Sequence, residues 1–132
     1  VPQYDVWKRF DDIDFAALPE QFVLKPTHTS GDIYFCEDKA KLDREVLRKT
    51  VDKWMRRKYY HQGREWGYKH IKPAIIADQI LVEDDGETLR DYRFMRFNGE
   101  PKFIILSQNH RDGTGIVVNY YDMQWNPMPI KK

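Results

Sequence analysis

The stretch PAIIADQILVE, residues 73–83, restricts the range of possible folds more than any other part of the sequence. Its apolar run is nearly continuous, which is typical of a strand that is buried on both faces. Earlier in the chain, residues 39–60 carry apolar side chains at helical spacing and predict a long amphipathic helix, with Asp38 as its N-cap. The apolar positions of this helix are Leu42, Val46, Leu47, Val51, Trp54, Met55 and Tyr59.

Short strands surround these two elements. Residues 22–25 (FVLK) and 32–38 (DIYFCED) predict two strands that are joined by the turn PTHTSG. Further polar turns are predicted at 83–87 and 109–113. We therefore expect an α+β fold, in which an antiparallel sheet carries the long helix on one face.

The last part of the chain predicts a three-stranded antiparallel meander. Its strands are DYRFMRF (91–97), KFIILS (102–107) and GIVVNYYD (115–122), and the dipeptide Asn98-Gly99 is a strong hairpin signal between the first two. Residues 1–20 show no sustained period, and we expect them to form an extended arm or linker.

Composition indicates a soluble globular protein, because 41% of the residues are hydrophobic and 33% are charged. No apolar run approaches the length of about 18 residues that a membrane span needs. Cys36 is the single cysteine, so a disulfide framework is excluded. Together with the absence of a signal-like segment, the lone thiol leads us to expect a cytoplasmic location. We also expect a monomer.

The charges are unevenly distributed. Residues 39–72 hold twelve Lys and Arg against four Asp and Glu, while the rest of the chain holds ten bases and seventeen acids. A basic middle is typical of a solvated helix face, and it also suits an anionic partner. Residues 54–72 interleave bases with aromatics, so one alternative is a non-catalytic module that binds nucleic acid or an anionic polymer. Nucleic acid is the less favoured partner, since Trp54, Met55 and Tyr59 fit the buried stripe of the helix.

Several common sites are unsupported. The sequence contains neither a GxxxxGK[ST] phosphate loop nor a GxGxxG fingerprint, and it has no GxSxG nucleophile elbow. The four histidines lie far apart, at 28, 61, 70 and 110, without the ligand spacing of a zinc site. We expect His28 to be a surface residue of its loop.

The segment FVLKPTHTSG, residues 22–31, carries the strongest functional signal. Lys25 ends a strand, so its ammonium group is able to follow phosphate oxygens as a loop closes. The loop offers backbone N–H groups and the hydroxyls of Thr27, Thr29 and Ser30 as donors, and Gly31 permits close approach to a ligand. The plainer alternative is an exposed hairpin with a surface lysine.

In their order along the chain, FVLKPTHTSG, PAIIADQILVE, LRDYRFMRFNGEP and NYYDMQW resemble the TupA-like ATP-grasp family, which is associated with bacterial teichuronopeptide and cell-surface polysaccharide synthesis. The resemblance implies that residues 21–90 form a nucleotide-binding lobe and that residues 91–132 begin a second sheet. It also implies that the chain is a central, separately inactive part of a longer enzyme.

The resemblance further implies ATP and Mg²⁺ as cofactors, with the magnesium ligands beyond residue 132. Lys25 and Arg93 would stabilise the transferring phosphoryl group, and Thr29, Ser30 and Gly31 would cover the phosphates. Asp78, Gln79 and Leu81 would line the adenine site, with Ile76 and Leu106 as apolar walls, and Asp91 would bind the ribose. A solvated ion pair is the plainer reading of Asp91 and Arg93.

By the same resemblance, the parent enzyme would activate a carboxylate as an acyl phosphate for ligation. The acceptor would be a polysaccharide, an amino acid or a uronic acid. A glycosyltransferase of polysaccharide synthesis is the alternative, although the acidic run Asp11–Asp14 lies in the arm rather than after a strand.

Overall fold

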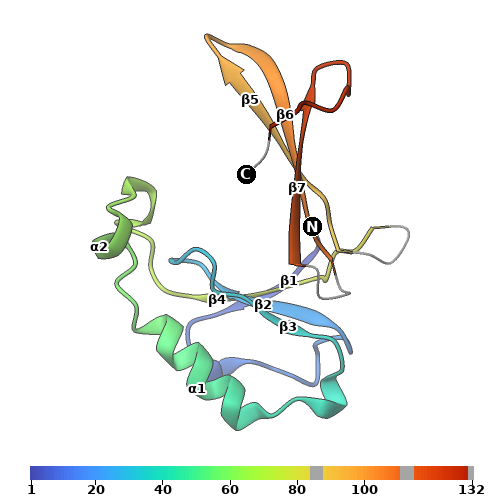
Figure 1. Cartoon of the computed structure of the whole chain (residues 1–132). Helices are drawn as coiled ribbons and strands as arrows, with labels where there is room; N and C mark the ends of the chain where they lie inside the picture. Colours follow the sequence, from blue (N-terminus) through green and yellow to red (C-terminus); the bar gives the residue numbers. More distant parts are fainter. Residues whose placement is uncertain (84–87, 111–114, 131–132) are drawn as a thin grey trace. The chain divides into compact units, whose positions relative to one another are not determined.

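The structure is a computed structural model that describes residues 1–83, 88–110 and 115–130. It divides into two compact units, Val1–Ile80 and Leu81–Lys132, each built on an antiparallel sheet (Figure 1). The predicted α+β class is confirmed. Most of the two polar turns predicted at 83–87 and 109–113 lies outside the described residues. Within those residues, no helix is both long enough and apolar enough to cross a bilayer.

The first unit contains a four-stranded sheet in the order β1-β4-β2-β3, and every neighbouring pair is antiparallel. Its strands are β1 (Gln3–Trp7), β2 (Phe22–Pro26), β3 (Tyr34–Cys36) and β4 (Ile75–Asp78). Residues 75–78 of the apolar stretch PAIIADQILVE thus form β4, an inner strand of this sheet, as the apolar run predicts. The strand is shorter than predicted, because it ends at Asp78 and the chain is exposed again at Gln79 and Leu81.

The core of this unit lies between one face of the sheet and the helix α1 (Arg44–Met55). Alternate residues of a strand point to the same face. Phe22 and Leu24 of β2 and Ile75 of β4 therefore share the core face, and all three are fully buried. On the helix, the buried positions are Leu47, Val51 and Trp54.

The helix is shorter than the predicted span of 39–60, and the prediction of a long helix was wrong. Asp38 and Asp43 are both suitable N-cap residues near its start. Asp38 caps only the short 3-10 helix η2 (Lys39–Lys41), whereas the Asp43 carboxylate accepts hydrogen bonds from the Glu45 and Val46 amides, both at 3.0 Å. At the other end the chain leaves the helix after Met55, and the single-turn helix α2 (Tyr60–Gly63) and the 3-10 helix η3 (Trp66–Tyr68) follow separately.

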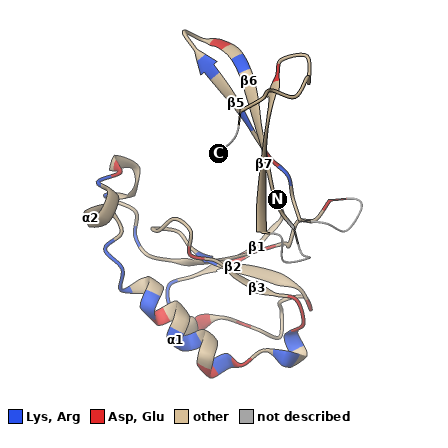
Figure 2. Ribbon diagram, in the orientation of Figure 1, with Lys and Arg blue, Asp and Glu red and all other residues tan. Residues whose placement is uncertain are grey.

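Residues 1–20, which we expected to form an extended arm or linker, are instead part of the first unit. They supply β1, which pairs with β4, and the 3-10 helix η1 (Phe10–Asp12), and they place apolar side chains in the core. Arginines of α1 pack on them: the guanidinium of Arg48 lies 4.8 Å from the Phe10 ring centroid, and it also pairs with Asp11 at 2.5 Å. This hydrogen bond from Arg48 lowers the pKa of Asp11. Figure 2 shows Lys and Arg along α1.

The second unit is the predicted three-stranded meander, which is confirmed. Its strands are β5 (Asp91–Phe97), β6 (Glu100–His110) and β7 (Gly115–Asp122), in the sheet order β5-β6-β7. Asn98 and Gly99 have positive φ angles of 50° and 84°, which the tight turn between β5 and β6 requires. Ile104 of β6 is the best buried apolar side chain among the described residues of this unit.

The packing of β1 makes a direct prediction about residues 1–20. Trp7 is 9% exposed on the core face, whereas its neighbour Val6 is 43% exposed on the other face. We expect Trp7→Ala to lower the free energy of unfolding by about 3–5 kcal/mol, because it empties a buried site. The control, Val6→Ala, is expected to change it by about 0.5 kcal/mol or less. Urea denaturation measures both, and equally small effects would contradict the packing of β1 against the core.

Candidate functional site

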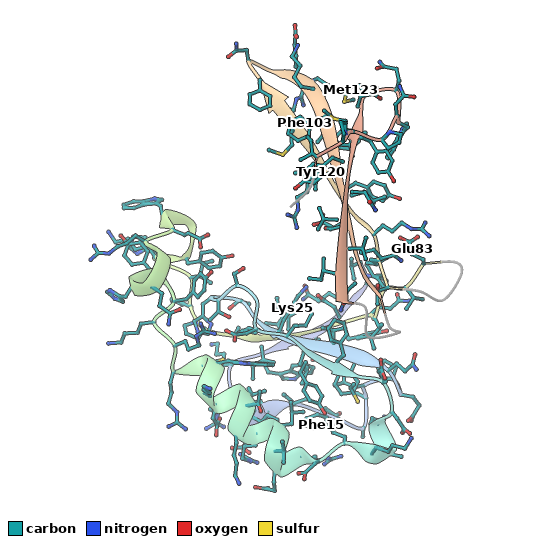
Figure 3. All side chains as sticks on the ribbon, viewed as in Figure 1. Phe15, Lys25, Glu83, Phe103, Tyr120 and Met123 are labelled. Carbon is teal, nitrogen blue, oxygen red and sulfur yellow. The ribbon has the colours of Figure 1, made fainter. Side chains whose placement is uncertain are left out.

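Lys25 lies at the end of β2, where the strand passes into the loop of residues 27–33 (Figure 3). Its neighbour Leu24 is on the core face, so the Lys25 side chain is on the opposite face of the sheet. The strand therefore fixes the backbone of Lys25, because Phe22 and Leu24 anchor it on the other side. The side chain is 44% exposed.

Lys25 forms an ion pair with Asp78, the last residue of β4. In the β2–β4 register, Lys25 stands opposite Ile76 and Val23 stands opposite Asp78, so the two charged side chains are diagonal neighbours on one face. The carboxylate is nearly buried, with 10% of its side chain exposed. Two predicted site residues that are far apart in the sequence thus meet across adjacent strands.

The loop after Lys25 has unused hydrogen-bond donors. None of the backbone N–H groups from His28 to Asp32 donates a hydrogen bond to a described residue. The Thr29 hydroxyl is buried and has no partner among the described residues, while Ser30 is exposed. Gly31 has a φ angle of 81°, a conformation that side chains disfavour, and nothing lies within 4 Å of where a Cβ would be. Successive backbone N–H groups without protein partners are the donors that anion-binding loops use, so this loop is suited to an anion.

His28 is buried, and the expectation of a surface histidine was wrong. It is 5% exposed, and its Nε2 donates to the Trp54 carbonyl at 3.1 Å. Because a carbonyl only accepts, Nε2 carries the ring proton and Nδ1 is left without a described partner. The histidine therefore fastens the start of the loop to the last turn of α1.

Two further contacts fasten the ends of the loop, and no pattern in the sequence predicts them. The Thr27 amide donates to the Ala74 carbonyl at 2.9 Å, and the Thr27 hydroxyl donates to the Lys72 carbonyl at 3.1 Å and accepts from the Ala74 amide at 3.0 Å. Thr27, which was expected to offer its hydroxyl to phosphate, thus uses it within the protein. At the other end, both oxygens of Asp32 accept from Arg57 at 2.5 Å.

The remaining residues of the predicted adenine site lie at and after the end of β4. Ile76 is half-buried on the same face as Lys25. The Gln79 side chain is exposed, and its backbone N–H donates to the Pro2 carbonyl at 3.0 Å. Leu81 begins the second unit and is 40% exposed.

In the second unit, Asp91 and Arg93 pair along one face of β5. The Arg93 Nη2 lies 2.5 Å from the Asp91 Oδ2, and both side chains are at least half exposed. The Ser107 hydroxyl of β6 lies 3.4 Å from the same carboxylate oxygen. The structure therefore brings these two predicted residues together. Leu106 is half-buried on β6.

Among the described residues, no group of three His, Cys, Asp or Glu side chains is arranged to hold a metal ion. Asp122 ends β7, and its carboxylate accepts hydrogen bonds from the side chain of Asn126 and the backbone N–H groups of Gln124 and Asn126. The hydrogen bond from the Asn126 side chain lowers the pKa of Asp122 most. Its oxygens already serve the turn after β7.

The buried carboxylate predicts strong coupling between Lys25 and Asp78. A double-mutant cycle with Lys25→Met and Asp78→Asn is expected to give a coupling free energy of about 1–3 kcal/mol in urea denaturation. The control pair, Lys102 and Glu100, is 2.6 Å apart with side chains 54% and 73% exposed. That exposed pair is expected to couple by less than about 1 kcal/mol. Equal coupling in the two cycles would show that the burial of Asp78 adds nothing.

The comparisons with known proteins bear on this arrangement. The profile of the TupA-like ATP-grasp family matches residues 1–132, which is the whole chain. No curated protein matches the chain, and no solved structure matches it. The family match covers the Lys25 strand, its loop, β4 and the meander in one alignment, and the chain therefore belongs to the TupA-like ATP-grasp family.

Proposed function

We propose that the chain binds ATP, with Lys25 and the backbone of residues 28–32 holding the phosphate groups. One observation carries this proposal: a strand-anchored ammonium group stands at the start of a loop whose consecutive amides have no described partner. An ammonium group and a series of N–H donors are the groups that bind phosphate oxygens best. The buried and unpartnered Thr29 hydroxyl supports the same assignment.

Binding requires Lys25 to change partner. In the ligand-free chain its charge is balanced by Asp78, and the ion pair keeps the long side chain close to the sheet. A triphosphate carries more negative charge than one carboxylate, so its oxygens compete well for the ammonium group. The flexible stem of lysine allows this exchange without a change in the strand.

Asp78 would then be free to bind the base. Its carboxylate only accepts hydrogen bonds, which suits the exocyclic amine of adenine. On the same face of the sheet lie Val23 and Ile76, which are apolar. A purine ring is flat and largely apolar, so this face supplies a suitable surface for it.

In the second unit, we propose that Asp91 accepts a hydrogen bond from a ribose hydroxyl and that Arg93 binds phosphate. Both side chains are exposed and share one face of β5. Their ion pair orients the guanidinium group before a ligand arrives. Arginine holds two oxygens in a fixed fork, so it positions an anion more rigidly than a lysine does.

We infer that the chain works within an enzyme that activates a carboxylate for ligation in cell-surface polymer synthesis. When bound, ATP would supply the γ-phosphoryl group that turns the carboxylate into an acyl phosphate, with ADP as the leaving group. An amine or another nucleophile would then displace phosphate from the acyl phosphate. Lys25 and Arg93 would stabilise the negative charge of the transferring group. We assign no magnesium ligand to the described residues.

A sugar-transferring enzyme is less well supported. Transfer from a nucleotide sugar commonly needs paired acids that hold a metal ion, and Asp11 and Asp12 were the nearest such acids in the sequence. In the structure Asp11 pairs with Arg48 and Asp12 pairs with Arg9. Their carboxylates are thus already neutralised by cations of the protein.

The proposed phosphate contacts predict which backbone amides respond to ATP. In an amide NMR titration, we expect the largest shift changes at Lys25, at residues 27–32 and at Asp78. Tripolyphosphate is expected to move the loop signals and also the Asp78 signal, because it draws Lys25 away from Asp78. Adenosine alone is expected to leave the loop signals in place. We expect Lys25→Ala to weaken ATP binding roughly tenfold, because a charge-assisted contact is lost.

The control is Lys49→Ala, which removes a charge from an exposed position on α1. This variant is expected to bind ATP as the unchanged protein does. Loop signals that stay in place at saturating ATP, or equal affinities for Lys25→Ala and Lys49→Ala, would rule out the assigned role of Lys25.

A further inference from the structure

Residues 56–72, which we call the basic-aromatic segment, connect α1 to β4 and carry charge that the nucleotide site does not use. The segment holds six Lys and Arg against one acid, Glu65. Figure 2 shows basic residues on the chain between α1 and α2. Five of the six cations form no ion pair with any described residue. These are Arg56, Lys58, Arg64, Lys69 and Lys72.

An exposed tryptophan lies among these cations. Trp66 is 71% exposed, although burial of a large ring is favourable. The Lys69 ammonium lies 4.4 Å from the Trp66 ring centroid and 5.8 Å from that of Tyr60. His70 stands edge-on to the indole, with 6.2 Å between the ring centroids. The segment thus holds a ring and a cation in one place, where a ligand with both an apolar face and negative charge would fit.

Both ends of the segment form hydrogen bonds with the loop of residues 27–33. At its start, Arg57 donates to both oxygens of Asp32, the residue after Gly31. At its end, the Lys72 carbonyl accepts from the hydroxyl of Thr27. The side chains of Asp32 and Arg57 are 14% and 31% exposed, so this ion pair is well shielded from solvent. The two ends of the segment are therefore held at the loop that is proposed to bind the phosphates.

We propose that the basic-aromatic segment binds an acidic oligosaccharide, a chain of sugars that carry carboxylate groups. Arg64 and Lys69 bind the carboxylates, and the CH-rich face of one pyranose ring packs on Trp66. That this chain is the substrate whose carboxylate is activated rests on the proposed function. The binding itself follows from the charge and the exposed ring alone.

The rings favour an oligosaccharide over a single-stranded nucleic acid. Nucleic-acid sites of this kind stack successive bases on several open rings. In this segment Trp66 is exposed, whereas Tyr59, Tyr60 and Tyr68 are half-buried. Tyr59 and Tyr68 also pack edge to face, with 4.8 Å between their centroids. One open ring suits one sugar, and an acidic peptide without rings would leave it unused.

The test measures binding of an oligogalacturonate to the full chain by calorimetry, with a neutral dextran oligomer and a single-stranded oligodeoxynucleotide for comparison. We expect the oligogalacturonate to bind and the neutral oligomer not to bind. Trp66→Ala and Lys69→Gln are each expected to weaken binding about tenfold. Trp66→Tyr retains a ring and is expected to recover most of the affinity. The matched charge control, Lys49→Gln on α1, is expected to bind as the unchanged protein does.

Three results would overturn the proposal: no binding of the oligogalacturonate, equal binding by Trp66→Ala and the unchanged protein, or tighter binding of the oligodeoxynucleotide. An ATP titration of the same samples separates the two proposals. Oligosaccharide binding without ATP binding would support the role of the basic-aromatic segment and contradict the proposed nucleotide site. ATP binding without oligosaccharide binding would contradict only the role that we propose for the basic-aromatic segment.

Discussion

The antiparallel pairing of β2 with β4 is the constraint on which the rest of the first unit depends. One face of this pair supplies the fully buried side chains that pack under α1, and the other face brings Lys25 beside Asp78. A shift of one residue in the register would exchange the two faces, because side chains alternate along a strand. The hydrophobic core therefore fixes the place of the ion pair as firmly as it fixes the strands.

The loop after β2 is fastened at three points, yet its donors remain available. Thr27 bonds to the residues before β4, His28 to the end of α1, and Asp32 to Arg57. Each contact uses a side chain or the first amide of the loop, so the amides from His28 to Asp32 have no described partner. A loop that is held by its side chains loses less conformational entropy when a ligand binds its backbone. The same short segment thus anchors both ends of the basic-aromatic segment and carries the amides that we propose as the anion site.

Sequence patterns predicted the elements that depend on interactions between residues close together in the chain. The meander followed from alternation and from Asn98-Gly99. The strand and loop around Lys25 indicated a phosphate contact, whereas Asp78 was implied only by the family resemblance, and neither indicated the ion pair between them. The limits of α1 did not follow, because Asp38 and Asp43 are both good caps and only the structure shows which one begins the α-helix. The burial of His28 and the Arg57–Asp32 pair depend on residues about 25 positions apart, for which a single sequence gives no signal. The strand β1 was missed for the same reason, since its partner β4 lies far along the chain.

The central claim is that the Lys25 ammonium group is shared between Asp78 in the free chain and phosphate in the bound chain. Side-chain ¹⁵N NMR of the lysine ammonium groups tests it directly, with Lys25→Arg used to assign the Lys25 signal and Asp78→Asn as a reference for the unpaired group. The account predicts that the Lys25 signal differs between the free protein and Asp78→Asn, and that saturating ATP moves it in both. A Lys25 signal that Asp78→Asn leaves unchanged, or that saturating ATP does not move, would contradict it.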